Sequence, residues 1–320
     1  MQSRLIWALR IVLFIGLAGI FLFYVPFQEI IDAIRGASPY YFWMSYLLGF
    51  PTSYLGATRL WILTRKQGIQ ASPLKLMEIN YVIKFYSFFS PASAVGSFMR
   101  WYKLSGDGKS AEALTAVAVN RLFDIFIAIV FGMFWVIGGS NQAILVQPRW
   151  ILLFLVIVLL LWLVVTRYSH PILLWIRRIT EKTHWNWLQK VRSYMERLSS
   201  SLLVYSRLEI HTLLLITIIG LLSELIGVLS FYYLALSIGL QVSITNLGWM
   251  RSIFFLVSLA PFTLTGGIGL REVSIVWVLT AMGVHADLAV AFSFLVYARS
   301  AISSLTGGLI ELISLRKIHE

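Results

Sequence analysis

The sequence predicts an all-α polytopic integral membrane protein with about six full spans and two re-entrant or broken helical hairpins. Hydrophobic residues make up 59% of the 320 residues and charged residues only 12%, a composition outside the range of soluble domains. Apolar runs of roughly 20 residues, enough to cross a ~30 Å hydrocarbon core, recur along the chain. Basic residues gather between these runs, as they do in cytoplasmic loops. We therefore expect one transmembrane domain over residues 1–320, a multi-pass protein of the prokaryotic inner or plasma membrane.

Composition also narrows the chemistry. The chain has no cysteine and five scattered histidines, so thiolate and zinc-type sites are not expected, and we expect neither a metal nor a cofactor. The net charge of +12 lies mainly in the segments between spans, where it sets topology and meets anionic lipid heads. We therefore do not expect nucleic-acid binding.

The first two spans follow from length and flanking charge. Leu5–Val25 is long enough to cross and has no signal-peptide cleavage site, so it is predicted to be a retained span that begins in the cytoplasm. Tyr40–Leu63 is predicted to return, with a kink at Pro51. Its cytoplasmic end is marked by Arg59, Arg65 and Lys66.

The next apolar segment, Leu74–Met99, breaks at Ser90-Pro91 and is basic on both flanks. If both flanks are cytoplasmic, the segment enters and leaves on one side, as a re-entrant hairpin or a closely paired crossing. Lys84 within it either lines the hairpin's cavity or snorkels to the interface, and snorkelling is the favoured interpretation. The following spans are Ala111–Ile137 and Trp150–Val165.

Residues 167–209 form the longest polar stretch, with eight basic residues against three glutamates. Such a segment is predicted to be cytoplasmic. Apolar residues recur within it every three or four positions, which suits an amphipathic helix on the membrane surface. A linker packed on the membrane domain explains the pattern equally well.

The last third of the chain contains the second broken segment. Leu213–Ile238 crosses outward, and Leu288–Leu315 must end in the cytoplasm beside Arg316 and Lys317. Leu247–Gly283 between them must therefore enter from outside and return there. Its helix is broken by Pro261, Gly266, Gly267 and Gly269.

The two broken segments share a pattern: Pro91-x4-Gly96-x3-Arg100 and Pro261-x4-Gly266-x4-Arg271. Their flanks are predicted on opposite sides, so the hairpins have opposite orientations, as in inverted-repeat transporters with a binding site near the midplane. The alternative is coincidence, because Pro, Gly and Arg are common in membrane loops.

Several charges lie deep in predicted spans. Asn120, Arg121 and Asp124 fall near mid-bilayer, where an isolated charge costs on the order of 2.5–3.5 kcal/mol. Arg121 and Asp124, three residues apart, are predicted to pair, and Glu224 and Arg299 are candidate partners. These charges either hold helices together or line a substrate path. Arg271 and Glu272 either cap the second hairpin or contact ligand.

The motif N-R-L-F-D, Asn120 to Asp124, after the first Pro-Gly-Arg element, together with P-F-T-L-T-G-G-I-G-L-R-E from Pro261, resembles the lysylphosphatidylglycerol synthase transmembrane-region family. This flippase-like family includes the membrane half of the multiple peptide resistance factor. The resemblance implies movement of modified or glycosylated lipids between leaflets. The family's motif usually begins Glu-Arg, whereas Asn120 stands here. No soluble aminoacyltransferase domain is expected, because the chain ends at Glu320.

The leading hypothesis is a lipid flippase or lipid-carrier transporter for an anionic, aminoacylated, glycosylated or polyprenyl-linked lipid. Basic residues would engage a phosphate head, and acidic residues would balance or gate it. The candidate basic residues are Arg100, Arg121, Arg271 and Arg299; the acidic ones are Asp124, Glu224 and Glu272. A membrane enzyme that transfers a group to a lipid head, and a subunit that scaffolds a partner glycosyltransferase, remain the alternatives.

Overall fold

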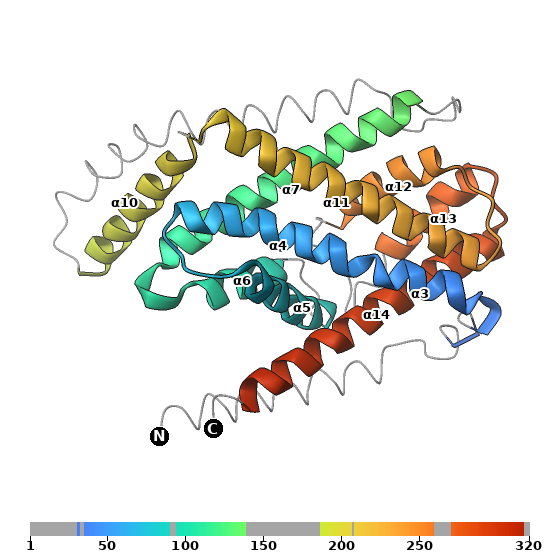
Figure 1. The fold of residues 1–320 in the computed structure, drawn as a ribbon, viewed down its shortest axis with the longest axis horizontal. Helices are drawn as coiled ribbons and strands as arrows, with labels where there is room; N and C mark the ends of the chain where they lie inside the picture. The colour runs from blue at the N-terminus through green and yellow to red at the C-terminus, as the bar shows by residue number, and fades with distance from the viewer. Residues whose placement is uncertain are drawn as a thin grey trace.

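A computed structural model describes residues 31–32, 35–89, 94–138, 186–206, 208–258 and 270–316. Within these ranges the regular elements are helices, in agreement with the all-α prediction. The predicted spans Leu5–Val25 and Trp150–Val165 lie outside the described residues. Figure 1 shows the helices as one bundle, with α4 and α11 side by side across it.

Among the described residues, three helices are long and apolar enough to cross a membrane: α7 (Ser110–Gly138), α11 (Ile210–Ser237) and α14 (Ala286–Arg316). They coincide with the predicted spans Ala111–Ile137, Leu213–Ile238 and Leu288–Leu315. Long uninterrupted apolar sequence without Pro is what lets each helix continue this far, so these three elements were predictable in position and length.

The predicted span Tyr40–Leu63 is two helices, α3 (Pro39–Leu47) and α4 (Gly49–Lys66). The interruption falls at Leu48, whereas the kink was predicted at Pro51. Proline has no N–H to donate, and its ring collides with the carbonyl four residues earlier. That carbonyl belongs to Leu47, the last residue of α3. The break therefore lies just before the proline that causes it.

Each predicted hairpin contains two short described helices that pack against each other. The first consists of α5 (Pro73–Phe89) and α6 (Ala94–Leu104), and the second of α12 (Ile244–Val257) and α13 (Leu270–Ala281). Each helix is shorter than the roughly 20 residues needed to cross a bilayer. Their re-entrant path and inverted relationship stay predictions.

Helix α10 (Asn186–Ser206) occupies the amphipathic segment. Its C-terminal turns pack on the membrane helices: the Tyr205 hydroxyl donates to Leu63 O at 2.9 Å, and Gln67 Nε2 donates to Ser201 O at 2.7 Å. Burial raises the pKa of the Tyr205 hydroxyl, so the hydroxyl stays a neutral donor. This end of α10 fits the interpretation as a packed linker, and contact of α10 with a membrane surface stays a prediction.

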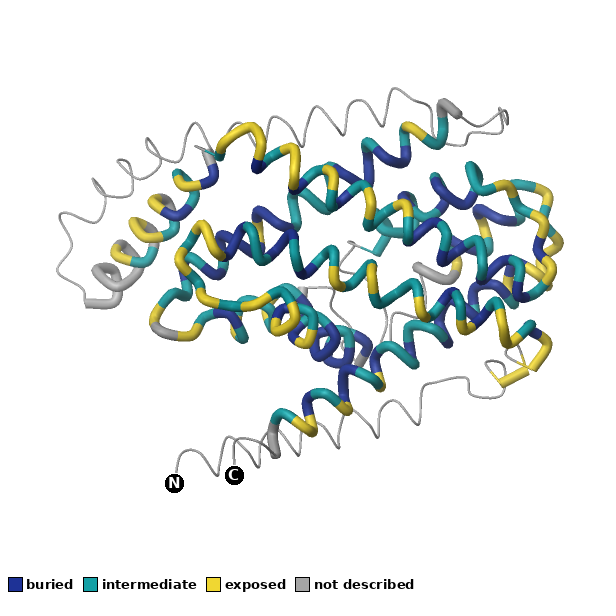
Figure 2. The backbone as a smooth tube through the Cα atoms, in the orientation of Figure 1, coloured by how far each residue is buried: buried dark blue, intermediate teal, exposed yellow. Residues whose placement is uncertain are grey.

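Side-chain burial is concentrated where α5, α11, α12, α13 and α14 meet, and Figure 2 shows this as dark blue along their inner faces. Glycines allow close approach there. A Cβ at Gly307 of α14 would collide with the carbonyl oxygen of Tyr81 on α5. The first hairpin and the last long helix are therefore fixed against each other by backbone contact.

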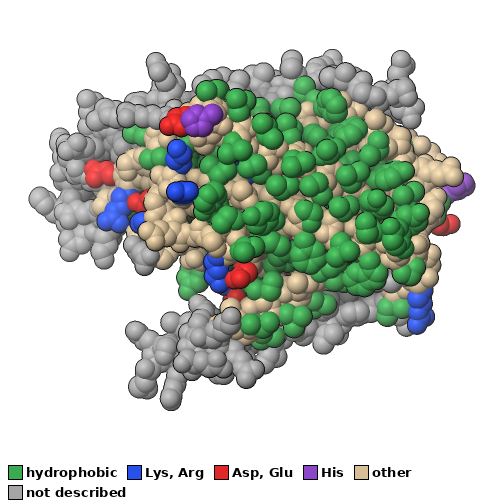
Figure 3. Space-filling model, in the orientation of Figure 1, with side chains coloured by type: hydrophobic (Ala, Val, Ile, Leu, Met, Phe, Trp, Pro, Cys, Tyr) green, Lys and Arg blue, Asp and Glu red, His purple; other side chains and the backbone are tan. Residues whose placement is uncertain are grey.

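The outer face of the bundle is apolar. On α11, Ile210, Leu214, Ile218 and Leu222 repeat at four-residue intervals and are 45–71% exposed. Figure 3 shows a continuous field of hydrophobic side chains over α3, α4 and α11, with charged side chains gathered around its edges. Exposed apolar surface of this extent suits lipid tails and not water.

Candidate functional site

A cavity of about 430 Å³ lies among six helices, α3, α4, α5, α11, α12 and α14. We call it the central pocket. Its lining is Tyr46, Gly49, Thr52, Ser53, Lys84, Ser87, Phe88, Gly227, Ser230, Phe231, Arg251, Arg299, Ser300 and Ser303. Three of these side chains are cationic and seven carry a hydroxyl. A polar, basic cavity inside an apolar bundle makes this the candidate functional site.

Arg299 of α14 links its own helix to α3 and α11 at the pocket. Its Nη1 donates to the hydroxyls of Ser45, at 3.1 Å, and Ser230. The Ser230 hydroxyl also donates to Ser45 O at 2.8 Å, which ties α11 to α3. The Arg299 guanidinium lies 5.0 Å from the centre of the Phe231 ring. Hydrogen bonds and a cation–π contact therefore hold this deep charge in place.

Arg251 of α12 enters the same pocket beside Glu224 of α11, with 2.7 Å between Arg251 Nη1 and Glu224 Oε2. Arg299 was the candidate partner of Glu224; the structure gives the ion pair with Glu224 to Arg251. Gly227 makes the approach possible, because a Cβ there would overlap the Arg251 guanidinium. Arg251 Nε is buried and has no hydrogen-bond partner within the described residues.

Lys84 of α5 supplies the third cation. Its Nζ donates to Ser53 Oγ at 2.8 Å and lies 4.1 Å from the centre of the Tyr81 ring. Snorkelling was the favoured expectation, and the structure instead directs this amine into the pocket. The hydroxyl on α4 and the aromatic ring on α5 replace part of its hydration, so the charge need not reach the interface.

A second group of charges joins α4 to α7. Arg59 forms an ion pair with Asp124, and its Nε donates to Asn120 Oδ1 at 3.1 Å. Asn120 Nδ2 in turn donates to Asp124 Oδ2 at 3.3 Å. Arg121 was the candidate partner of Asp124 within α7, and the ion pair that the structure gives to Asp124 is with Arg59 of α4. Arg59, expected to mark the cytoplasmic end of its span, is only 6% exposed.

Two further arginines belong to this region, which we call the arginine cluster: Arg59, Arg100, Arg121 and Asp124. Arg121 lies over the Phe255 ring, 5.4 Å from its centre. Arg100 of α6 is within electrostatic range of the other three residues, and its Nε is buried without a partner in the described part of the chain. Three cations thus share one carboxylate.

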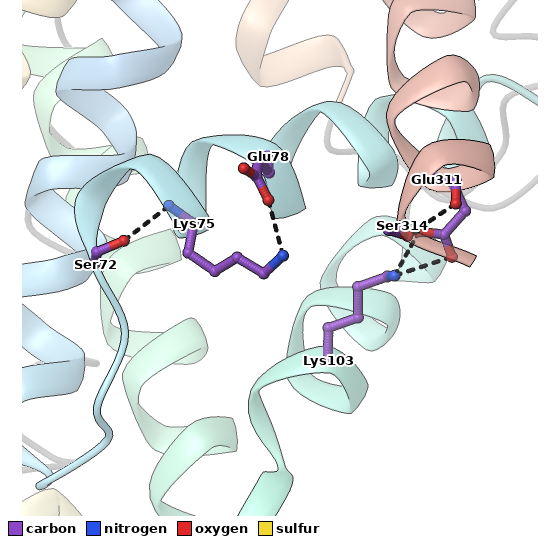
Figure 4. Close-up of polar contacts among 6 residues, drawn as sticks. All are labelled: Ser72, Lys75, Glu78, Lys103, Glu311 and Ser314. Carbon is purple, nitrogen blue, oxygen red and sulfur yellow. Dashed lines mark hydrogen bonds and ion pairs between the residues drawn. The ribbon is translucent and has the colours of Figure 1, made fainter. Parts of the chain in front are cut away.

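Glu311 of α14 is a buried carboxylate that sequence analysis missed. It is 4% exposed and accepts hydrogen bonds from the Tyr86 hydroxyl, at 3.2 Å, and Lys103 Nζ, at 2.8 Å. Figure 4 shows Lys103 reaching Glu311 from the second helix of the first hairpin. The ion pair joins α6 to α14, and the Tyr86 hydrogen bond joins α5 to it.

The remaining predicted residues are placed only in part. Arg271 and Glu272 lie in the first turn of α13, and only their backbone is described. Gly96 of α6 packs on Ser87 of α5. Four further positions fall outside the described residues together with Pro91: Pro261, Gly266, Gly267 and Gly269. Their proposed role at the hairpin tips stays a prediction.

The missed pocket residue is Arg251, and a signal for it existed. Arg251 is the eighth residue of the apolar helix α12 and has no acidic residue near it in the sequence. A charge in such a position requires a partner from another helix. Within the described residues, no group of His, Asp and Glu is placed to hold a metal ion.

Comparison with known families gives one match. A model described as the lysylphosphatidylglycerol synthase TM region matches residues 6–308. Comparisons with curated proteins and with solved structures find no match.

Proposed function

The chain belongs to the lysylphosphatidylglycerol synthase transmembrane-region family, and from that premise we propose that it moves an anionic lipid between the leaflets of the cell membrane. Family membership and apolar helices make it a membrane protein concerned with lipid modification or flipping. Lipid flipping, as either a flippase or a lipid-carrier transporter, is the more specific function proposed here.

The central pocket is the observation that carries the proposal. Lys84, Arg251 and Arg299 come from three different helices and converge on one cavity. Placing three cations inside an apolar bundle is costly unless they meet an anion or water. A lipid phosphate supplies that anion, and guanidinium groups suit it because they donate two hydrogen bonds at once.

The arginine cluster is a second basic site on the proposed route of the lipid headgroup. Arg59 of α4 lies one to two helical turns beyond Thr52 and Ser53, which line the pocket on the same helix. Asp124 neutralises one of its three arginines, so net positive charge remains for a headgroup. Asn120 contributes a neutral acceptor to this site by accepting a hydrogen bond from Arg59. Asn120 stands where the family's motif usually has Glu.

Three carboxylates, one buried and two partly buried, favour transport over group transfer. Asp124, Glu224 and Glu311 each form an ion pair with a cation from another helix. A general base must be free to accept a proton at the reacting group, and a carboxylate engaged with Arg or Lys is poorly suited to that task. This arrangement supports positioning roles for the three residues.

Purified protein in liposomes tests the proposal. Lipids labelled on the acyl chain keep their natural head, and an impermeant reductant added outside bleaches only the outer leaflet. We expect the protein to accelerate loss of the protected inner-leaflet signal for an anionic lipid. If leaflet exchange were not accelerated for any of several phospholipids and polyprenyl-linked lipids, the proposal would be contradicted.

The same vesicles distinguish the two rival functions. A new lipid product seen by mass spectrometry after incubation with donor lipids would indicate a membrane transferase. Recovery of a stoichiometric partner glycosyltransferase, with no lipid exchange by the isolated chain, would indicate a scaffolding subunit that uses α10.

A further inference from the structure

The arginine cluster contains guanidinium donors that the described protein does not use. Within the described residues, the guanidinium groups of Arg100 and Arg121 donate no hydrogen bond, and the Nε of Arg100 is buried. The recorded contact of Arg121 is with the Phe255 ring. Each guanidinium has five N–H donors in a planar fork. Because a buried donor without an acceptor is costly, these side chains call for a ligand that accepts several hydrogen bonds.

The carboxylate of the cluster is already engaged by other groups. Asp124 forms its ion pair with Arg59 and accepts a hydrogen bond from Asn120 Nδ2. Asn120 Oδ1 accepts from Arg59 Nε. Arg59 is buried, whereas Arg100 and Arg121 are partly exposed. In the described part of the chain, the two accessible guanidinium groups therefore have no carboxylate of their own.

The arginine cluster and the central pocket lie at successive levels along the same helices. On α11, a Cβ at Gly220 would lie 3.2 Å from Arg59 Nη1 of the cluster. A Cβ at Gly227 would overlap the Arg251 guanidinium of the pocket. Seven residues of α-helix separate these two glycines, a rise of about 10 Å. The two basic sites are therefore close enough for a headgroup to pass between them and far enough apart to hold two phosphate groups.

We propose that the arginine cluster is a phosphate site of its own, occupied at the same time as the central pocket. Arg100 and Arg121 contact the phosphate oxygens, because a guanidinium fork donates two hydrogen bonds to an oxyanion at once. Arg59, held by Asp124 and Asn120, is a positioning residue. Two neighbouring sites favour release, since entry of one anion displaces the next. The lipid origin of the phosphate rests on the proposed transport function.

The number of lipids bound to the full chain in detergent tests this site. We expect two molecules of dihexanoyl phosphatidic acid per chain. Arg121→Gln should weaken one of the two binding events at least about tenfold, and Lys84→Gln should weaken the other. Arg65→Gln is the matched control, since Arg65 is an exposed cation on α4, and it should weaken neither.

Two results would overturn the second site. One is a single bound lipid in the unmodified chain. The other is two binding events of unchanged affinity in the folded Arg121→Gln protein. Arg100→Gln removes the other proposed contact from a different helix, so it gives the same test if Arg121→Gln does not fold.

Inorganic phosphate distinguishes the two sources of the phosphate group. Displacement of the cluster-bound lipid only by a large excess of inorganic phosphate would support a lipid headgroup, whereas displacement at equal concentration would overturn the lipid origin. Two bound lipids without leaflet exchange in vesicles would contradict the proposed transport function. Leaflet exchange by a chain that binds one lipid would contradict the second site alone.

Discussion

Gly227 is the residue at which α11 makes room for the Arg251 guanidinium. We expect Gly227→Ala to displace Arg251, because the added Cβ would overlap the guanidinium carbon and two of its nitrogens. Binding of anionic lipid should weaken about tenfold, the value of one charge-assisted hydrogen-bonded contact. Gly56→Ala on α4 is the control, since its Cβ would meet no atom within 4 Å. Equal affinity in both variants would rule out this role for Gly227.

Arg59 and Asp124 offer a second prediction at the same scale. Arg59→Leu leaves the Asp124 carboxylate, 22% exposed, without its ion pair, and should lower the free energy of unfolding by about 3–5 kcal/mol. The double variant Arg59→Asp/Asp124→Arg, which exchanges the two charges and keeps one carboxylate beside Arg100 and Arg121, should recover part of that loss. Unfolding in mixed detergent and SDS measures both; equal losses in the single and double variants would contradict the coupling.

Single residues also show how far sequence reasoning reaches. Span lengths correctly placed Arg121, Asp124, Glu224 and Arg299 inside the long helices α7, α11 and α14. Their partners did not, because spacing within one helix favours local pairs such as Arg121 with Asp124, while the tertiary fold brings Arg59 from α4 instead. Partner choice between helices depends on their rotation and contact, which no single span specifies.

At the scale of elements, the first hairpin is held to α14 by Lys103 and Glu311. Lys103→Glu should destabilise the protein by about 3 kcal/mol, because it places a second carboxylate beside a buried one. Exchanging the charges, in Lys103→Glu/Glu311→Lys, should restore part of the stability.

The pair Lys75–Glu78, also in Figure 4, is the control for that prediction. Both side chains are more than half exposed, so Lys75→Glu should cost less than about 1 kcal/mol. A thermal or SDS unfolding series that gave the two pairs equal weight would show that the buried contact does not hold the hairpin.

A helix break near Pro51 was predictable, because proline lacks an N–H and its ring collides with the carbonyl of Leu47, where α3 ends. The predicted breaks at Pro91 and Pro261 lie outside the described residues and stay predictions. The close contact of α5 with α14 was not predictable. It depends on Gly307 meeting the Tyr81 backbone, a fit that only the assembled bundle specifies.

At the scale of the whole molecule, an apolar outer surface encloses a basic interior. Exposed apolar side chains on α11 suit lipid tails, while the central pocket suits a phosphate head. The general class, a membrane protein, was predictable from composition and apolar spans; a functional interior stays a prediction. The pocket itself was not, because its lining comes from six helices and no linear pattern records their meeting.

The most direct test of the account measures leaflet exchange of acyl-labelled phosphatidic acid in liposomes that contain the full chain, Lys84→Gln or Lys75→Gln. We predict rapid exchange by the first protein, at least about tenfold slower exchange by Lys84→Gln, and no change for the exposed control. Equal exchange rates for all three proteins, each folded and reconstituted to the same density, would contradict the claim that the central pocket carries the lipid head.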